Sequence, residues 1–285
     1  MPEIAVGDIV GRKSYNKDLY FKVRELYRND DGRVMAVLCG LLVRLIADAP
    51  LDDLEKLPPD VVAAHWRETM VNQGERIKRC FERREQEQIR SLSRQDVATF
   101  DVPGQVLHLD GDPDYLELCM TTYKQLGVPH DGYHIPENKQ PKEVYGLLEK
   151  HRPNILVLTG HDAYTKGKTD FRNMDNYRNS RHFVEAVREA RRFEKNLDDL
   201  VIFAGACQSY YEAILEAGAN FASSPERVLI HAFDPVFIVE KLAYTPVHRS
   251  IGLKEVIEAT ITGYPGIGGL ETRGLHRIGA PRSAY

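Results

Sequence analysis

Ile155-Leu-Val-Leu-Thr-Gly-His-Asp162 is an apolar run that ends on an imidazole, and Val201-Ile-Phe-Ala-Gly-Ala-Cys-Gln-Ser209 has the same design but delivers a thiol. Short apolar runs closed by small residues are typical of strands buried in a parallel sheet. The carboxyl ends of parallel strands meet at one edge of the sheet, and ligands bind there. The sequence therefore predicts that His161 and Cys207 lie side by side at that edge.

The chain from residue 105 onward alternates strand-like and helical segments. Such alternation indicates βαβ units joined by right-handed crossovers. The predicted fold class is α/β, with a Rossmann-like, mostly parallel sheet flanked by helices, and a glycine-rich tail follows it. The expected strands cover 105–110, 134–135, 155–161, 201–207 and 228–233, and the expected helices cover 113–126, 142–151, 180–195, 209–217, 235–242 and 253–260.

Residues 4–47 carry the pattern of a small β domain. Turn signals at Gly7-Asp8 and Asn29-Asp-Asp-Gly32 separate short alternating runs, which predicts an SH3-like or Tudor-like barrel. Residues 60–98 are helical and alternate Glu with Arg, a pattern typical of a solvated spacer helix. The predicted domains are a small β-barrel (1–49), a charged helical linker (50–103) and an α/β domain (104–285).

The composition is that of an ordinary soluble globular protein, with 285 residues of which 42% are hydrophobic and 28% charged. The net charge of −4 gives no electrostatic basis for binding nucleic acid or an anionic membrane. No apolar run approaches the roughly 18 residues of a membrane span. The N-terminus lacks the basic flank and apolar core of a signal peptide. We therefore expect a protein that stays in the compartment where it is made.

Four cysteines are scattered along the chain without any CxxC pair. This spacing is typical of reduced thiols and gives neither a disulfide framework nor a metal site. Cys39, Cys80 and Cys119 lie in ordinary apolar or helical contexts, where a structural role is expected. Cys207 is the cysteine whose neighbours indicate chemistry.

Two features of the sequence favour the thiolate of Cys207, which is the nucleophilic form of the side chain. A helix expected from Ser209 directs its N-terminal dipole at the sulfur, and a protonated His161 would form an ion pair with it. Gly205 and Ala206 leave room for a substrate carbonyl, and glycine tolerates a tight turn. A cysteine nucleophile activated by histidine indicates a hydrolase, and a peptidase first of all.

His161 is the expected general base, and later the acid that protonates the leaving amine. The backbone N–H of Cys207 and the amide after His161 would form the oxyanion hole, beside the small residues Gly160 and Ala206. Asp162 either orients the imidazole or shapes a pocket for a cationic side chain. Taken singly, Cys207 is typical of a buried core residue, and His161 is typical of a hydrogen-bonded residue at the end of a strand. Their joint placement favours a catalytic pair. No metal or organic cofactor is expected.

A nucleotide site is the first alternative, because Gly160-His-Asp-Ala-Tyr-Thr-Lys-Gly-Lys-Thr169 has the outline of a phosphate loop. The Walker pattern needs glycine at position 162. This chain has Asp162 there, and its carboxylate would repel phosphate. Nucleotide hydrolysis is therefore not the preferred interpretation.

A receiver-like signalling domain without peptidase activity is the second alternative. Leu107-His-Leu-Asp-Gly-Asp112 resembles the first strand of a response-regulator receiver, with acidic residues at the strand end. A receiver usually carries a lysine after its fifth strand, where this chain has Phe233-Asp-Pro235, and it has no use for Cys207. In a peptidase, Asp110 and Asp112 would cap the following helix.

The order and spacing of the reactive pair resemble those of the caspase-like clan of cysteine peptidases. Histidine comes first and cysteine follows 46 residues later, close to the gap of about 50 in that clan. Gly205-Ala-Cys207 fits the second block of the clan, whereas the first block differs because glycine precedes the histidine in Gly160-His161. The resemblance implies a caspase-like version of the α/β fold.

Four motifs together resemble one known family, the sporulation-specific YabG cysteine proteases. They are Gly7-Asp-Ile-Val-Gly-Arg-Lys-Ser-Tyr15, Thr159-Gly-His-Asp162, Phe203-Ala-Gly-Ala-Cys-Gln-Ser209 and Ser223-Ser-Pro-Glu-Arg227. The resemblance covers nearly the whole chain and implies Cys207 as nucleophile and His161 as base. It implies an endopeptidase made in the mother-cell cytoplasm and later associated with the spore coat. Its partners would be spore-coat and germination-related precursor proteins, cut after basic residues, chiefly arginine.

An arginine preference requires a carboxylate in the pocket for the residue before the cleaved bond. The sequence does not choose among the candidates, which are Asp162, Asp170, Asp175 and Asp234. Ser93-Arg94-Gln95 offers a basic site for self-cleavage, with a simple helix-end arginine as the alternative. Substrate docking, self-inhibition and dimerisation are all open as roles of the N-terminal barrel, so a homo-oligomer is open too.

Overall fold

The computed structural model describes residues 4–92, 99–165 and 167–282. The chain divides into two compact units, Met1–Lys78 and Arg79–Tyr285. Each unit is treated by itself below. Within the described ranges no helix is both long and apolar enough to cross a membrane.

The first unit contains a five-stranded antiparallel sheet, which confirms the small N-terminal β domain. Its strands are β1 (Ile9–Arg12), β2 (Tyr20–Arg28), β3 (Val34–Gly40), β4 (Ile46–Pro50) and β5 (Leu54–Lys56). They lie in the order β4-β3-β2-β1-β5, with a 3-10 turn (Leu51–Asp53) before β5. Val10, Val23 and Leu38 are fully buried in its core. Because β5 pairs with β1, the sheet extends beyond residue 49, the expected end of the domain.

Helix α1 (Pro59–Leu92) is the expected charged helix. Proline at its first position and Asp60 in its first turn suit a helix N-terminus. Its second half differs from the solvated spacer that the charge pattern predicted. Within the second unit, Arg83 Nη2 and Arg84 Nε donate to Glu240 at 2.6 and 2.8 Å. Glu240 is 1% exposed, so this half of the helix is anchored through buried charge.

The second unit is built on a six-stranded, mostly parallel sheet. Its strands are β7 (Val106–Asp110), β8 (His130–His134), β9 (Ile155–Thr159), β10 (Val201–Ala204), β11 (Phe221–Ser223) and β13 (Ile267–Gly269). Their order is β13-β11-β10-β9-β7-β8, and β13 is the antiparallel edge strand. The order reverses between β7 and β9, which is where open α/β sheets bind ligands. The predicted α/β class is confirmed.

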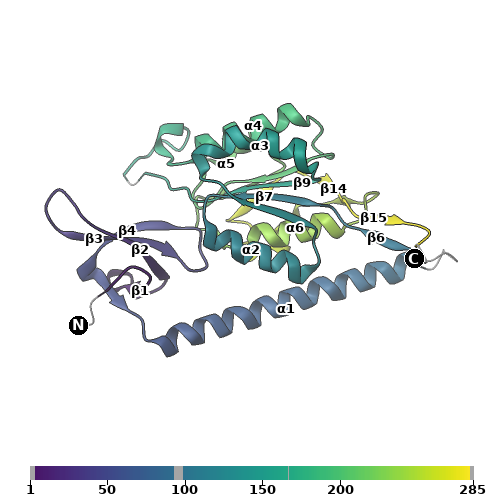
Figure 1. The fold of residues 1–285 in the computed structure, drawn as a ribbon. Helices are drawn as coiled ribbons and strands as arrows, with labels where there is room; N and C mark the ends of the chain where they lie inside the picture. The colour runs from purple at the N-terminus through teal and green to yellow at the C-terminus, as the bar shows by residue number, and fades with distance from the viewer. Residues whose placement is uncertain (1–3, 93–98, 166, 283–285) are drawn as a thin grey trace. The chain divides into compact units, whose positions relative to one another are not determined.

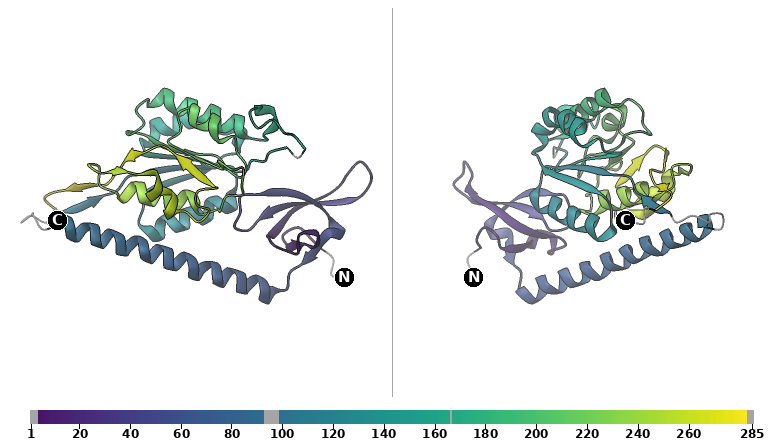
Figure 2. Two further views of the ribbon diagram at one scale, coloured as in Figure 1. Left: turned by 180° about the vertical axis from the view of Figure 1, so that it is seen from behind. Right: turned by 45° about the vertical axis from the view of Figure 1, so that its right-hand side comes forward.

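Helices cover both faces of this sheet (Figure 1). Those on one face are α3 (Gln140–His151), α4 (Ser180–Phe193) and α5 (Tyr211–Glu216), and those on the other are α2 (Pro113–Leu126) and α6 (Asp234–Tyr244). The same layering is seen from behind in Figure 2. The remaining elements are α7 (Leu253–Ala259), the strand pair β12 (Ser250–Ile251) and β14 (Thr272–Arg273), and the pair β6 (Phe100–Val102) and β15 (Arg277–Gly279).

The sequence explains these helices locally. Asp112 caps α2, Pro113 occupies its first turn, and Gly127 ends it with a φ of 67°. In α4 the buried positions Phe183, Val187 and Ala190 follow a helical period and face the sheet. Burying one such large apolar side chain contributes about 1.5–3 kcal/mol. Amphipathic packing therefore fixes these helices on the sheet.

The expected strand at 228–233 is absent from the described structure of this segment, and this prediction is wrong. The fifth parallel strand is instead β11, which pairs with β10 from Phe221 to Ala222. Residues 228–230 continue as a loop that passes the thiol of Cys207. The apolar character of Val228 to Phe233 serves burial beside the strand ends and the start of α6, not sheet pairing.

The anchoring of α1 gives a stability prediction. Glu240→Gln leaves the guanidinium groups of Arg83 and Arg84 beside a buried neutral amide, and should lower the free energy of unfolding by about 3 kcal/mol. Glu258→Gln is the control, because Glu258 and Lys254 form an exposed pair at 3.6 Å, worth less than about 0.5 kcal/mol. Urea denaturation of both variants measures the difference. Equal effects would contradict the anchoring role.

Candidate active site

The ends of β9 and β10 place the two predicted catalytic residues at equivalent positions. The strands are parallel neighbours in which Leu158 pairs with Ala204. The amide of Gly205 continues the ladder by donating to Leu158 O at 3.0 Å. His161 and Cys207 each follow the last paired residue by three positions. The backbone register therefore supports the sequence prediction that both residues come to one edge of the sheet.

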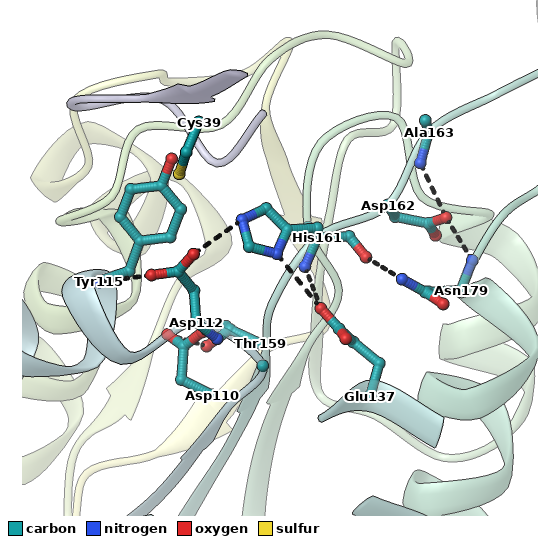
Figure 3. Close-up of polar contacts among 12 residues, drawn as sticks. Cys39, Asp110, Asp112, Tyr115, Glu137, Thr159, His161, Asp162, Ala163 and Asn179 are labelled. Carbon is teal, nitrogen blue, oxygen red and sulfur yellow. Dashed lines mark hydrogen bonds and ion pairs between the residues drawn. The ribbon is translucent and has the colours of Figure 1, made fainter. Parts of the chain in front are cut away.

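Two carboxylates flank the His161 ring (Figure 3). Asp112 Oδ2 lies 3.2 Å from Nε2 and Glu137 Oε1 lies 3.4 Å from Nδ1. The backbone amide of His161 also donates to Glu137 Oε1 at 2.6 Å, and its carbonyl accepts from Asn179 Nδ2 at 2.8 Å. The ring and the backbone of His161 are thus held from several sides.

Glu137 reaches His161 because two glycines make room for it. The residue lies in a 3-10 turn (Glu137–Lys139) that follows β8. A Cβ at Gly111 or at Gly160 would collide with its carboxylate oxygen. Burial alone would raise the pKa of Glu137, but the hydrogen bonds from the ring and amide of His161 outweigh it and hold this pKa below its usual range. Glu137 is therefore an ionised partner of the histidine.

Asp112 has two roles, one for each carboxylate oxygen. Oδ1 accepts from the amides of Asp114 and Tyr115 at 2.8 and 3.1 Å, which is the helix cap expected from the sequence. Oδ2 faces His161, and this role was missed. Asp110 supports the turn by accepting from the amide of Asp112 at 2.9 Å. The strand order is the signal that finds the second role, because it puts the end of β7 beside the end of β9.

Asp162 joins the ends of the two strands to helix α4. Its Oδ1 accepts from the amide of Asn179 at 2.7 Å, and its Oδ2 accepts from the hydroxyls of Ser180 and Ser209. Ser209 Oγ in turn accepts from the amide of Ala206 at 2.9 Å. Burial, only partly offset by these hydrogen bonds, raises the pKa of Asp162 to about 6. Asp162 thus connects α4 to Ser209 inside the protein, and the amide of Ala206 joins the same hydrogen-bond network through Ser209.

Cys207 is fully buried, and its sulfur lies against the backbone of a neighbouring loop. The amide of Ile230 donates to Sγ at 3.1 Å, and Sγ lies 3.9 Å from Ile230 O. The helix expected at Ser209 begins instead at Tyr211 and has six residues. The group that faces the sulfur is therefore the backbone amide of Ile230, in place of the helix N-terminus that the sequence predicted.

The turn before Cys207 needs its small residues. Gly205 has a φ of 110°, in the left-handed region that side chains disfavour. A Cβ there would collide with Ser223 Oγ, which itself donates to Ala206 O at 2.9 Å. The glycine expected to give space to a substrate thus also gives space to the packed end of β11.

Of the other cysteines, Cys80 and Cys119 have structural surroundings. Cys39 lies in β3 of the first unit and is a free thiol, as are the other three. Cys119 in α2 donates to Ala232 O at 3.5 Å. Burial, together with the carboxylate of Glu240, raises the pKa of Cys80 to about 12. Cys80 is therefore a protonated thiol and a poor nucleophile at neutral pH.

The four candidate pocket carboxylates lie in different places. Asp234 is buried at the start of α6, where Thr262 Oγ1 and the amide of Ile261 donate to it, and burial raises its pKa. Asp170 and Asp175 lie in the exposed loop after β9, and Asp175 pairs with Arg181 at 2.5 Å. Asp162 is buried and bonded to Ser180 and Ser209, as described above.

The proposed self-cleavage site at Arg94–Gln95 lies outside the described residues.

Comparison with known proteins identifies relatives of the whole chain. The family model described as YabG peptidase U57 matches residues 5–281. The sporulation-specific protease YabG of Bacillus subtilis (strain 168) is 44% identical over 285 aligned residues, which cover 98% of each chain. No solved structure matches the chain.

The raised pKa of Asp162 predicts a pH dependence of stability. Its folded value of about 6 exceeds the ordinary 3.8, so folding favours the protonated form. The protonated carboxyl therefore contributes about 3 kcal/mol of stability below pH 4, and this contribution is lost as the pH rises through 6. Urea denaturation between pH 4 and 7 should show this loss in the wild type and not in Asp162→Asn. Parallel curves for the two proteins would contradict it.

Gly160→Ala tests the placement of Glu137. The new methyl group should push the carboxylate away from His161 and reduce kcat on a peptide substrate by about 100-fold, the scale of a misplaced catalytic group. Gly146→Ala is the matched control, because a Cβ at that exposed position of α3 meets no atom within 4 Å. It should leave kcat unchanged. A Gly160→Ala enzyme with wild-type kcat would refute the positioning role of Glu137.

Proposed function

The chain belongs to the YabG peptidase family and is a protease, and from this premise we propose that it is a cysteine endopeptidase with Cys207 as nucleophile and His161 as base. The observation that carries the proposal is the register of β9 and β10. These neighbouring parallel strands bring the imidazole and the thiol to equivalent positions, three residues past their last pair. Both positions lie at the carboxyl ends of the strands, which is the edge where open α/β sheets bind ligands.

The proposed reaction has two halves. The thiolate of Cys207 attacks the carbonyl carbon of the scissile bond, and the C–N bond breaks as His161 gives its proton to the leaving amine. His161 then takes a proton from water, which attacks the thioester. The C–S bond breaks, the peptide leaves as a carboxylic acid, and the thiolate is restored. Backbone amides at the strand ends are the proposed donors to the oxyanion.

The charges around the pair support these roles. An imidazolium at His161 would face two carboxylates, Asp112 and the ionised Glu137. A thiolate at Cys207 would accept the amide of Ile230, which already donates to the sulfur at 3.1 Å. A hydrogen bond to the charged form stabilises that form. Each partner of the proposed ion pair thus has a group of complementary charge or polarity beside it.

We further propose that the substrates are spore-coat and germination-related precursor proteins, cut after basic residues and chiefly after arginine. The name of the relative, a sporulation-specific protease, supports a role in sporulation. The setting that we propose is the mother-cell cytoplasm first and the spore coat later. Asp170 and Asp175 are the better candidates for the specificity pocket, because Asp162 and Asp234 are buried and bonded within the protein. The family match favours peptidase over receiver-like signalling.

Alanine replacement tests the catalytic pair. Cys207→Ala and His161→Ala should each reduce cleavage of an arginine-containing peptide by about 1,000-fold or more, because the nucleophile and its base act as one unit. Cys119→Ala, which removes another buried thiol, is the control and should retain activity. Mass spectrometry of wild type and Cys207→Ala then tests self-cleavage at Arg94–Gln95. Full activity of Cys207→Ala would reject the proposal.

A further inference from the structure

The segment Ser224–Ile230, here called the cover segment, lies directly against Cys207. It follows β11 and returns toward the end of β10. Val228 O accepts from the amide of Gln208 at 3.1 Å, and the amide of Ile230 donates to Cys207 Sγ at 3.1 Å. Cys207 and the residue that follows it are therefore bonded to this segment, and Cys207 has no exposed surface. A peptide carbonyl cannot reach the sulfur while the cover segment stays in place.

The side chain of Arg227 bonds the cover segment to residues outside it. Arg227 Nε donates to the hydroxyl of Tyr177 at 2.8 Å, and Nη2 bonds Glu212 at 2.5 Å. The guanidinium also lies 5.5 to 6.0 Å from the ring centroids of Tyr177, Tyr210 and Phe171, within the reach of cation–π attraction. Tyr177 and Tyr210 stack with centroids 5.0 Å apart. The residues that surround the Arg227 guanidinium are here called the cage; they are Phe171, Tyr177, Tyr210 and Glu212.

The backbone around this contact is held in an unfavourable conformation. Ser224 and Arg227 in the cover segment, and Gln208 opposite it, have φ values of 67°, 56° and 55°. Residues other than glycine rarely adopt this region, and such strain persists where surrounding contacts enforce it. Arg227 Nη1 also donates to the carbonyls of Ser224 and Pro225, both at 3.2 Å. The side chain of Arg227 thus stabilises a segment whose backbone conformation is unfavourable by itself.

We propose that the cover segment is an autoinhibitory element latched by Arg227, and that its release from the cage is the step that opens Cys207 to substrate. The inference rests on the proposed function in its claim that Cys207 is the nucleophile. The latch is suited to reversible opening, because Glu212 is half exposed and such a partly solvated ion pair is weak and sensitive to salt. The Ile230 amide would therefore stabilise the thiolate in the closed form only. Opening would remove it from the sulfur, leave His161 as the partner of the thiolate, and keep the β9 and β10 register intact.

Thiol alkylation tests the latch without relying on peptidase activity. Full-length wild type and Arg227→Ala are treated with iodoacetamide, and the rate of modification at Cys207 is measured by mass spectrometry. We expect at least a tenfold rise in Arg227→Ala, because the cover segment opens more often. Arg192→Ala is the matched control: it removes an arginine from an exposed pair with Glu189 at 2.7 Å and should react at the wild-type rate.

Two milder variants distinguish loss of the Arg227 contacts from a general loosening of the protein. Glu212→Gln and Tyr177→Phe each remove one partner of Arg227 and should give smaller rises at Cys207, with Cys119 still reacting at its wild-type rate. An unchanged rate at Cys207 in Arg227→Ala and Glu212→Gln would overturn the proposal, as would equal acceleration at Cys119. Faster alkylation at Cys207 combined with full peptidase activity in Cys207→Ala would reject the nucleophile while leaving the cover segment supported.

Discussion

The in-register pairing of β9 with β10 is the constraint on which the rest of the second unit depends. Parallel strands align their carboxyl ends, so a register of Leu158 with Ala204 decides which side chains emerge together. A slip of one residue in the pairing would bring a different pair of residues together at that edge of the sheet. The buried apolar faces of both strands, packed between two layers of helices, prevent that slip.

Around these strand ends the protein buries several carboxylates, and each carboxylate comes from a different part of the chain. Asp112 belongs to the start of α2, Glu137 to the turn after β8, and Asp162 to the link between β9 and α4. Unpaired burial of such groups would be costly. Because each carboxylate is bonded within the protein, these polar groups hold the residues at the strand ends, and apolar packing holds the middles of the strands.

Patterns local in sequence predicted much of this fold and part of the site. Apolar runs that end on Gly-His and Gly-Ala-Cys were enough to predict two neighbouring strands followed by His161 and Cys207, because a buried strand is recognisable from its apolar composition. Glu137 could not be found this way, since it approaches His161 from a 3-10 turn with no motif of its own. The buried partner of Arg83 and Arg84 escaped prediction because Glu240 lies more than 150 residues away. The strand at Phe221 was missed because it has three residues, whereas the longer apolar run at Val228 forms the loop over the thiol.

The two glycines that admit Glu137 have a consequence for how the chain can change over time. Gly111 and Gly160 follow different strands, β7 and β9, yet the same carboxylate fills the space beside both. A lineage that lost Glu137 could accept side chains at both positions. Glu137 could then not return without a clash unless both positions became glycine again. These three residues are therefore expected to be inherited as a unit, and their joint variation among relatives would record where the histidine has changed its partner.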